Sequence, residues 1–337
     1  MRVAIVFLNT YNTDRALRMF TWEFWEDMAL LKTGDEFIFL TDQQKAPNLS
    51  TKNIQILRQK KTGIKWMDKK RLSKALYVSQ TDCCITINEN GFTISHFQKK
   101  ENKKTDRHAK RIDFITNAEE HTKKKELSLP VISTIKPACR TVITSLPWAE
   151  TESIKTQYTG GRSFFLFIGN IGEQHHLVEL LKAFSSFKKW QQSNMQLVIA
   201  GYTTAFTDRF EEKLETYKYK ADIVLLKNAA STEIAKLLAV CYAVLYPVSG
   251  DVFPLAVLWA VQSGKAVIAT DNYINRQITA NAEWVDENNI AEGFAKAMIL
   301  LYKDEKQLQS KVQQAVETSG NFNRSRMLTE VWNCIEK

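Results

Sequence analysis

Residues 164–184 read FFLFIGNIGEQHHLVELLKAF, and this stretch combines the two patterns that decide the fold. Residues 164–168 are continuously apolar and are followed by Gly169, while the residues from 174 onward form an amphipathic segment of helical length. A continuously apolar strand is typical of a parallel sheet that is covered by helices on both faces. The stretch therefore predicts a buried strand, a glycine turn and a helix.

The same alternation continues through the rest of the second half. Short apolar runs predict strands, amphipathic segments between them predict helices, and Gly169, Gly201 and Gly264 punctuate the strand ends. Right-handed connections then give a doubly wound α/β domain, which binds its ligand at the carboxyl ends of the strands. The predicted strands are 164–168, 197–200, 223–226, 243–246, 266–269 and 283–285, and the predicted helices lie near 174–192, 205–219, 231–240, 255–263 and 289–303.

The first half carries a weaker pattern. Apolar residues recur at helical spacing between residues 14 and 31, which predicts a helix there. A second, smaller Rossmann-like sheet is expected from strands over 3–8, 36–40, 53–57, 83–87, 113–116 and 131–135. We place the domain boundary in the polar segment 149–162. The expected organisation is an N-terminal domain over 1–150, a C-terminal domain over 151–320 and a helix over 321–337 that returns to the first domain.

The composition is that of an ordinary globular protein, with 44% apolar and 25% charged residues among 337. The apolar start at residues 3–8 is too short for a signal peptide and lacks a cleavage site, so we expect a buried strand. No stretch is apolar for long enough to cross a bilayer. The five cysteines are odd in number, Cys83 and Cys84 are adjacent, and no CxxC pair occurs. This pattern predicts reduced, buried thiols in a cytoplasmic protein, and no metal site.

The formal net charge of +9 predicts an anionic partner. A basic run extends from Lys99 to Lys125, where it alternates with acidic residues and has no nucleic-acid-binding module beside it. We therefore expect no nucleic acid. A solvated face is the simplest interpretation of the run, and peripheral contact with an anionic membrane at its inner, cytoplasmic face is the alternative.

Two runs carry a resemblance to a known family. Residues 164–184 resemble the opening of the C-terminal domain of the family 4 retaining glycosyltransferases, among the glycosyl transferases group 1. Residues 249–270, SGDVFPLAVLWAVQSGKAVIAT, resemble their donor loop and the helix that follows it. The resemblance implies a GT-B fold, with two Rossmann-like domains, a cleft between them and a C-terminal helix crossing back to the first. It also implies sugar transfer from a nucleotide diphosphate donor with retention of configuration, no required metal and no cofactor.

The resemblance places a diphosphate site at the turn after residue 168. The family usually has Arg and Lys there, and the matching residues are Asn170 and His175. Asn170 donates hydrogen bonds without a charge, and His175 is only partly protonated near neutrality unless a bound diphosphate raises its pKa. The backbone near Gly172 is expected to join them. The lack of Arg and Lys at these positions argues against catalysis, because such donors usually stabilise the charge of the transition state.

The family's pair of glutamates around the donor loop matches Asp251 and Trp259. Asp251 keeps a carboxylate that is expected to hold the sugar. Trp259 has only an N–H donor and cannot replace an acceptor for the ribose hydroxyls, so we interpret it more readily as a packing residue. The candidate catalytic residues are Asp251 and His175. The candidate nucleotide-sugar-binding residues are Gly169, Asn170, Gly172, Gly201, Val252, Phe253, Leu255 and Trp259, with the amides of Val252 and Phe253 contacting an anion.

Two functions from different classes follow. The leading hypothesis is a glycosyltransferase, which transfers a hexose from a nucleotide diphosphate sugar to a glycan or lipid-linked acceptor. The alternative is a catalytically impaired pseudo-glycosyltransferase that acts as a binding or scaffold subunit, since the Arg, the Lys and the second Glu are replaced. A Rossmann dehydrogenase is poorly supported, because no GxGxxG follows a first strand.

Overall fold

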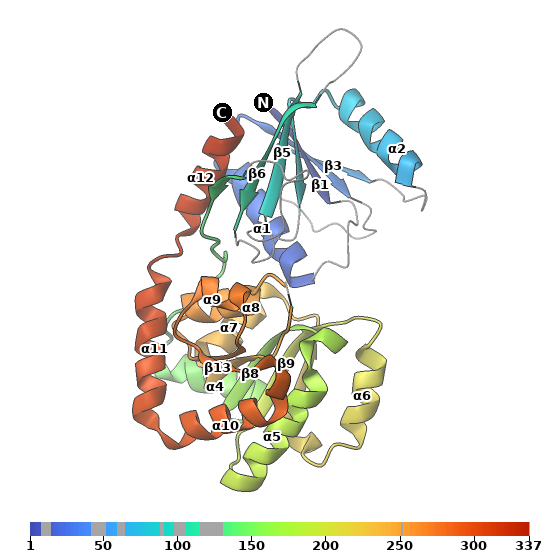
Figure 1. The fold of residues 1–337 in the computed structure, drawn as a ribbon. Coiled ribbons are helices and arrows are strands. Elements are labelled where there is room, and N and C mark those ends of the chain that lie inside the picture. The colour runs from blue at the N-terminus through green and yellow to red at the C-terminus, as the bar shows by residue number, and fades with distance from the viewer. Residues whose placement is uncertain are drawn as a thin grey trace. The chain divides into compact units, whose positions relative to one another are not determined.

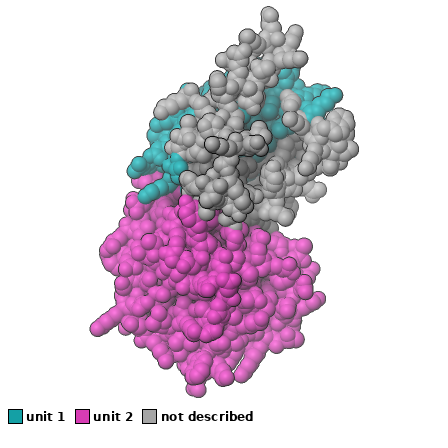
Figure 2. Space-filling model, in the orientation of Figure 1, with its two compact units in different colours: residues 1–13, 17–136, 325–337 teal, residues 14–16, 137–324 magenta. Residues whose placement is uncertain are grey.

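The computed structural model describes residues 1–7, 15–41, 52–58, 65–87, 91–97, 106–114, 131–250 and 252–336. The chain divides into two compact units (Figure 2). Unit 1 comprises residues 1–13, 17–136 and 325–337, and unit 2 comprises residues 14–16 and 137–324. Each unit contains its own sheet (Figure 1).

Unit 2 has a fully parallel sheet of six strands in the order β10-β9-β8-β11-β12-β13. Numbered along the unit, this order is 3-2-1-4-5-6, which is the doubly wound order of dinucleotide-binding folds. The predicted doubly wound α/β fold is therefore confirmed. The strands are β8 (Phe164–Asn170), β9 (Gln196–Tyr202), β10 (Ile223–Lys227), β11 (Ala243–Tyr246), β12 (Val267–Thr270) and β13 (Glu283–Val285).

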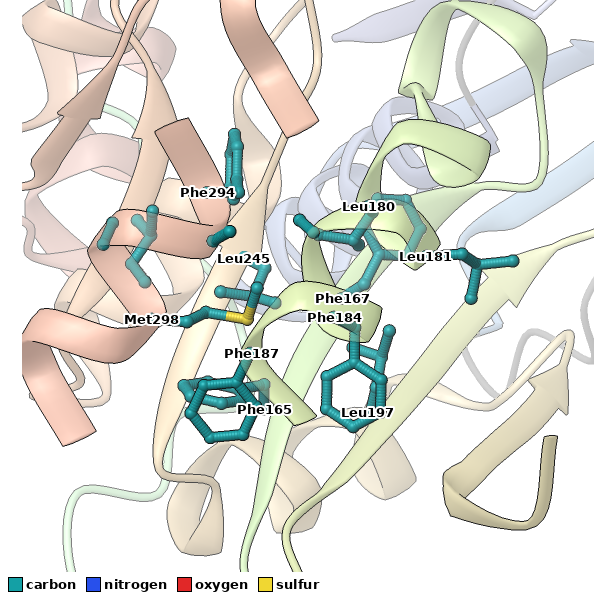
Figure 3. Close-up of a cluster of buried hydrophobic side chains, with 14 of the residues drawn as sticks. Phe165, Phe167, Leu180, Leu181, Phe184, Phe187, Leu197, Leu245, Phe294 and Met298 are labelled. Carbon is teal, nitrogen blue, oxygen red and sulfur yellow. The ribbon is translucent and has the colours of Figure 1, made fainter. Parts of the chain in front are cut away.

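The core of unit 2 explains why β8 is continuously apolar. All seven residues of β8 are buried, and Phe165 and Phe167 pack against helices α5 and α10 (Figure 3). The ring of Phe165 meets the ring of Phe187 of α5 edge to face, with centroids 5.3 Å apart. Met298 of α10 completes the same cluster. Burial of these large aromatic side chains on one face of the central strand is a major stabilising contribution in such a layer.

Helices connect the strands of unit 2. They are α4 (Trp148–Thr159), α5 (Leu177–Gln191), α6 (Thr207–Glu215), α7 (Ser231–Val240), α8 (Leu255–Gln262), α9 (Tyr273–Ile278), α10 (Ile290–Lys303) and α11 (Glu305–Ser319). The polar segment 149–162 forms most of α4, which ends at Gly160 in the left-handed conformation, with a φ of 61°. Polarity there reflects an exposed helix face rather than an unstructured connection.

Unit 1 has a mixed sheet of seven strands in the order β3-β2-β1-β4-β5-β6-β7. The strands are β1 (Arg2–Phe7), β2 (Glu36–Thr41), β3 (Ile54–Arg58), β4 (Cys83–Ile87), β5 (Gly91–Phe97), β6 (Asp106–Asp113) and β7 (Val131–Thr134). Strands β4, β5 and β6 pair antiparallel. Of the predicted strand at 113–116, Asp113 is the last residue of β6, Phe114 lies in a bend, and residues 115–116 lie outside the described residues. The expectation of a smaller sheet is wrong, because this sheet has more strands than that of unit 2.

Three helices belong to the described part of unit 1. They are α1 (Arg15–Leu31), α2 (Lys65–Val78) and α12 (Arg324–Glu336). Phe24, Trp25 and Met28 of α1 are fully buried. Trp332 of α12 packs against Phe37 of β2, with ring centroids 6.0 Å apart. No helix among the described residues is both long and apolar enough to cross a membrane.

Candidate functional site

The candidate site lies in unit 2 at the carboxyl ends of β8 and β11. These neighbouring strands form the point where the strand order reverses, and open α/β sheets bind ligands there. The turn after β8 leads into α5, and the loop after β11 leads into α8 (Figure 1). Seven of the predicted site residues, at 169–175 and 252–255, are thus brought to one edge of the sheet.

Both helices begin at this edge without a capping side chain. The residue before α5 is His176 and the residue before α8 is Pro254, and neither accepts a hydrogen bond from the helix with its side chain. The first N–H groups of a helix have no partner within the helix, and the helix dipole adds a partial positive charge to them. Two uncapped helix N-termini at the switch point favour an anionic ligand.

The turn after β8 is fixed to the end of β9. Gly169 pairs with Gly201 in the parallel ladder, and the Ile171 N–H donates to the Tyr202 carbonyl at 2.8 Å. The hydroxyl of Thr204 donates to the carbonyl of Ile171. These bonds hold the turn close to the sheet edge, where its backbone faces any ligand at the strand ends.

Glycine at two of the predicted positions has a steric reason. A Cβ on Gly201 would lie 2.4 Å from Cγ1 of Ile171, and a Cβ on Gly169 would lie 3.0 Å from Cδ2 of His175. A Cβ on Gly172 would lie 3.4 Å from Nδ1 of His175. Gly201 thus packs closely against the turn and Gly169 makes room for the imidazole, whereas at Gly172 the Cβ would make an ordinary contact with the ring.

His175 is buried, with 0% of its surface exposed, in the 3-10 turn Glu173–His175 that precedes α5. Burial, with a smaller contribution from the neighbouring His176, lowers the pKa of the His175 imidazole to about 4. The ring is therefore neutral at pH 7 in the protein without ligand. The sequence alone predicts partial protonation, because the depth of burial follows from packing.

The loop between β11 and α8 places Phe253 and Leu255 in the interior, with 2% and 3% of their surfaces exposed. The Val252 N–H, expected to contact an anion, donates instead to the Gly250 carbonyl at 2.9 Å. The Leu255 N–H donates to the Phe253 carbonyl at 2.8 Å. Asp251, the expected sugar-binding carboxylate, lies outside the described residues.

Trp259 has a definite structural partner. Its ring is buried within α8, with 2% exposed, and its indole N–H donates to the Thr141 carbonyl at 2.6 Å. One turn later, Gln262 accepts a hydrogen bond from the Cys139 N–H at 2.8 Å. Helix α8 therefore anchors the extended segment that precedes α4. This arrangement agrees with the interpretation of Trp259 as a packing residue, since its one polar atom is already bonded.

Sequence reasoning missed several polar residues at the same sheet edge. Asn228 follows β10 with a φ of 58°, and its side-chain oxygen accepts from both the N–H and the hydroxyl of Thr203, each at 3.2 Å. Asn272 follows β12 and donates to Glu287 at 2.9 Å. Each comes soon after a buried strand, and that position along the chain is the signal by which they can be found.

The described residues contain no group of three or more His, Cys, Asp or Glu side chains placed to hold a metal ion. All five cysteines are free thiols. Burial raises the pKa of Cys83 to about 12 and that of Cys241 to about 11, so neither is a thiolate near neutral pH.

The family model described as glycosyl transferases group 1 matches residues 149–318. The chain belongs to this family. It is a glycosyltransferase, and the matched region contains both the β8–α5 turn and the loop before α8. No curated protein sequence matches the chain.

Solved glycosyltransferase structures share the fold of the whole chain. The sucrose-phosphate synthase of Thermosynechococcus elongatus is 12% identical, with a TM-score of 0.75 over 100% of this chain and 98% of that one. WaaG, a glycosyltransferase involved in lipopolysaccharide biosynthesis, is 11% identical, with a TM-score of 0.72 over 99% of each chain. HepE of Anabaena, solved with UDP and glucose, is 9% identical, with a TM-score of 0.69 over 100% of each chain. The glycosyltransferase thus has the two-domain GT-B fold.

Proposed function

We propose that this glycosyltransferase moves a hexose from a nucleotide diphosphate sugar to a glycan or a lipid-linked acceptor, with retention of configuration and without a metal. The observation that carries the proposal is the pair of uncapped helix N-termini, of α5 and α8, at the β8/β11 switch point. A diphosphate is the part of the donor that such an edge suits best. The HepE structure with UDP and glucose supports the same ligand class.

The reaction breaks the bond between the anomeric carbon and a diphosphate oxygen, and the acceptor hydroxyl forms the new bond. Negative charge grows on the departing diphosphate, so groups that meet this charge lower the barrier. In our proposal the first-turn amides of α5, the backbone near Gly172 and the side chains of Asn170 and His175 meet it. Asp251 holds the transferred sugar, and the residues from Val252 to Leu255 close the other side.

The acceptor proposal rests on the net charge and on a structural neighbour. The net charge of +9 suits an anionic membrane, where lipid-linked acceptors are found, and WaaG acts in lipopolysaccharide biosynthesis. We propose a cytoplasmic enzyme that contacts the inner membrane face peripherally. Most of the basic run 99–125 lies outside the described residues.

Calorimetric titration with UDP, GDP and their sugars tests the donor class, and release of free sugar from any binder tests turnover. We expect one nucleotide to bind and its sugar to be hydrolysed slowly without acceptor. Replacing His175 with Ala should lower the rate by about 10²–10³-fold, as the loss of one charge-stabilising donor does elsewhere. His176→Asn is the matched control, because Asn tolerates the left-handed backbone that His176 adopts.

The acceptor is then tested with the nucleotide sugar that binds. Transfer to lipid-linked glycans in anionic vesicles is compared with transfer to soluble glycans, and co-sedimentation with the vesicles is measured in parallel. Binding of a nucleotide sugar without any turnover in either arm would contradict the proposed transfer. An enzyme that stays in the supernatant would contradict the membrane contact alone.

A further inference from the structure

The His175 imidazole is a buried polar group, and among the described residues neither of its nitrogens has a hydrogen-bond partner. Its ring stands edge to face with Phe167 of β8, with centroids 6.2 Å apart. A buried donor or acceptor without a partner costs about 1–3 kcal/mol. Such groups are uncommon in native folds, and one beside a ligand site points to a partner that arrives with the ligand.

Both nitrogens face glycines of the turn. A Cβ on Gly169 would lie 3.5 Å from Nε2 of His175, and a Cβ on Gly172 would lie 3.4 Å from its Nδ1. The glycines of the turn therefore lie close to both nitrogens. The turn leads directly into the N-terminus of α5, so His175 lies two residues before the first residue of that helix, Leu177.

The charged groups around the ring do not supply a cation to the turn. Residues 169–177 contain no Lys or Arg. Arg209 of α6 pairs with Glu173 at 3.2 Å, and His176 lies 3.9 Å from Glu179 of α5. Among the described ionisable groups, His176 is the one whose charge lowers the pKa of His175, after burial itself. A diphosphate arriving here would add negative charge where the described turn has no positive side chain to balance it.

We propose that binding of a nucleotide diphosphate sugar at this turn is coupled to the uptake of one proton by His175. The inference rests on the proposed function, because it requires the diphosphate at α5. The proton comes from solvent, the neutral imidazole becomes an imidazolium, and both nitrogens then donate hydrogen bonds. An opposite charge within about 4–6 Å raises a pKa by about 1–3 units, which offsets the effect of burial.

The sign of the pH dependence follows from the two protonation states. The complex binds more protons than the free protein between the pKa of the ring in the free protein, about 4, and its raised pKa in the complex. Donor affinity should therefore rise as the pH falls through the raised pKa. Below the pKa of the free protein, about 4, the affinity should no longer change with pH.

Calorimetry with UDP-glucose at about pH 6 tests the coupling, in buffers that differ in their enthalpy of ionisation, with a GDP-sugar as the second probe. A nucleotide sugar is the suitable probe, because both of its phosphates are esterified and neither titrates in this range. We expect the apparent binding enthalpy to change with the buffer, with a slope that shows proton uptake approaching one per site. Affinity should fall progressively between pH 5 and pH 8.

His175→Gln keeps a hydrogen-bonding side chain that cannot be protonated, so it should abolish the proton uptake and flatten the pH profile. His176→Gln is the matched control and should keep the proton uptake, with the pH profile moved slightly upward, because the charge of His176 lowers the pKa of His175. If His175→Gln unfolds, nitrogen NMR of labelled histidine in the wild-type enzyme reports the ring's protonation with and without UDP-glucose. Binding with a buffer-independent enthalpy and a neutral His175 in the complex would overturn the inference and leave the proposed function intact. Absence of binding by every nucleotide sugar would overturn both.

Discussion

Two residues at the ends of α5 adopt left-handed backbone conformations that L side chains rarely occupy. His176 has a φ of 45° and Gln192 a φ of 49°. Such a conformation costs a non-glycine residue about 1–2 kcal/mol, and glycine adopts it without steric strain. Both positions therefore store strain at the boundaries of one helix, and the first of them lies beside the candidate site.

Replacing His176 or Gln192 with Gly should therefore stabilise the protein by about 0.5–1 kcal/mol, after the larger entropy of the unfolded glycine is subtracted. The measurement is the thermal unfolding midpoint, which should rise by about 2 °C. Val178→Gly, inside the first turn of α5, is the control and should lower the midpoint. A midpoint that falls in both boundary variants would show that these backbones are not strained.

Individual side chains at the site were only partly predictable from the sequence. The position of His175 next to the turn could be predicted, because the strand and glycine pattern fixes where the turn lies. Its burial and neutrality could not, since they depend on Phe167 and on the close approach of the turn backbone. Trp259 was expected to pack, but its bond to Thr141, distant along the chain, requires the fold to be known.

At the scale of elements, the end of β9 packs against the turn of the candidate site. A Cβ on Gly201 would lie 2.4 Å from Cγ1 of Ile171, whose side chain is fully buried. Overpacking of this kind costs about 1–3 kcal/mol, because neither the strand nor the turn can shift freely. Gly201→Ala should therefore lower the free energy of unfolding by this amount and weaken nucleotide binding.

Gly34→Ala is the matched control, since no atom lies within 4 Å of the added Cβ. Denaturant unfolding measures the stability of each variant. Ile171→Ala removes the opposing atoms, so the double variant should lose less than the sum of the two single losses. Simple additivity of the two losses would mean that the contact does not limit the position of the turn.

Strands that are buried on both faces are easier to predict from the sequence than strands with an exposed face. β11 lies where the sequence predicts it, because strands of a covered parallel sheet are apolar throughout. β5 and β6 were missed, since strands of an antiparallel pair alternate apolar with polar residues, and the charges of β6 masked its pattern. Helix α4 lies in the segment where the sequence is polar, because much of its surface is exposed and few of its residues are apolar.

At the scale of the whole molecule, the sequence predicts the fold class, which the strand order of unit 2 confirms, and the candidate ligand edge follows from that order. The order β10-β9-β8-β11-β12-β13 leaves one switch point in unit 2, where the carboxyl ends of β8 and β11 meet. Chemistry at that edge is less predictable, because cationic side chains are replaced there by helix N-termini and a buried imidazole.

The central claim is that this switch point holds the diphosphate of a nucleotide sugar. An experimental structure of the enzyme with the bound nucleotide tests it most directly. We expect the diphosphate oxygens within hydrogen-bond distance of the first-turn amides of α5, residues 177–179, and beside Gly172 and His175. A nucleotide bound with its diphosphate at the opposite, amino-terminal edge of the unit 2 sheet would contradict the claim.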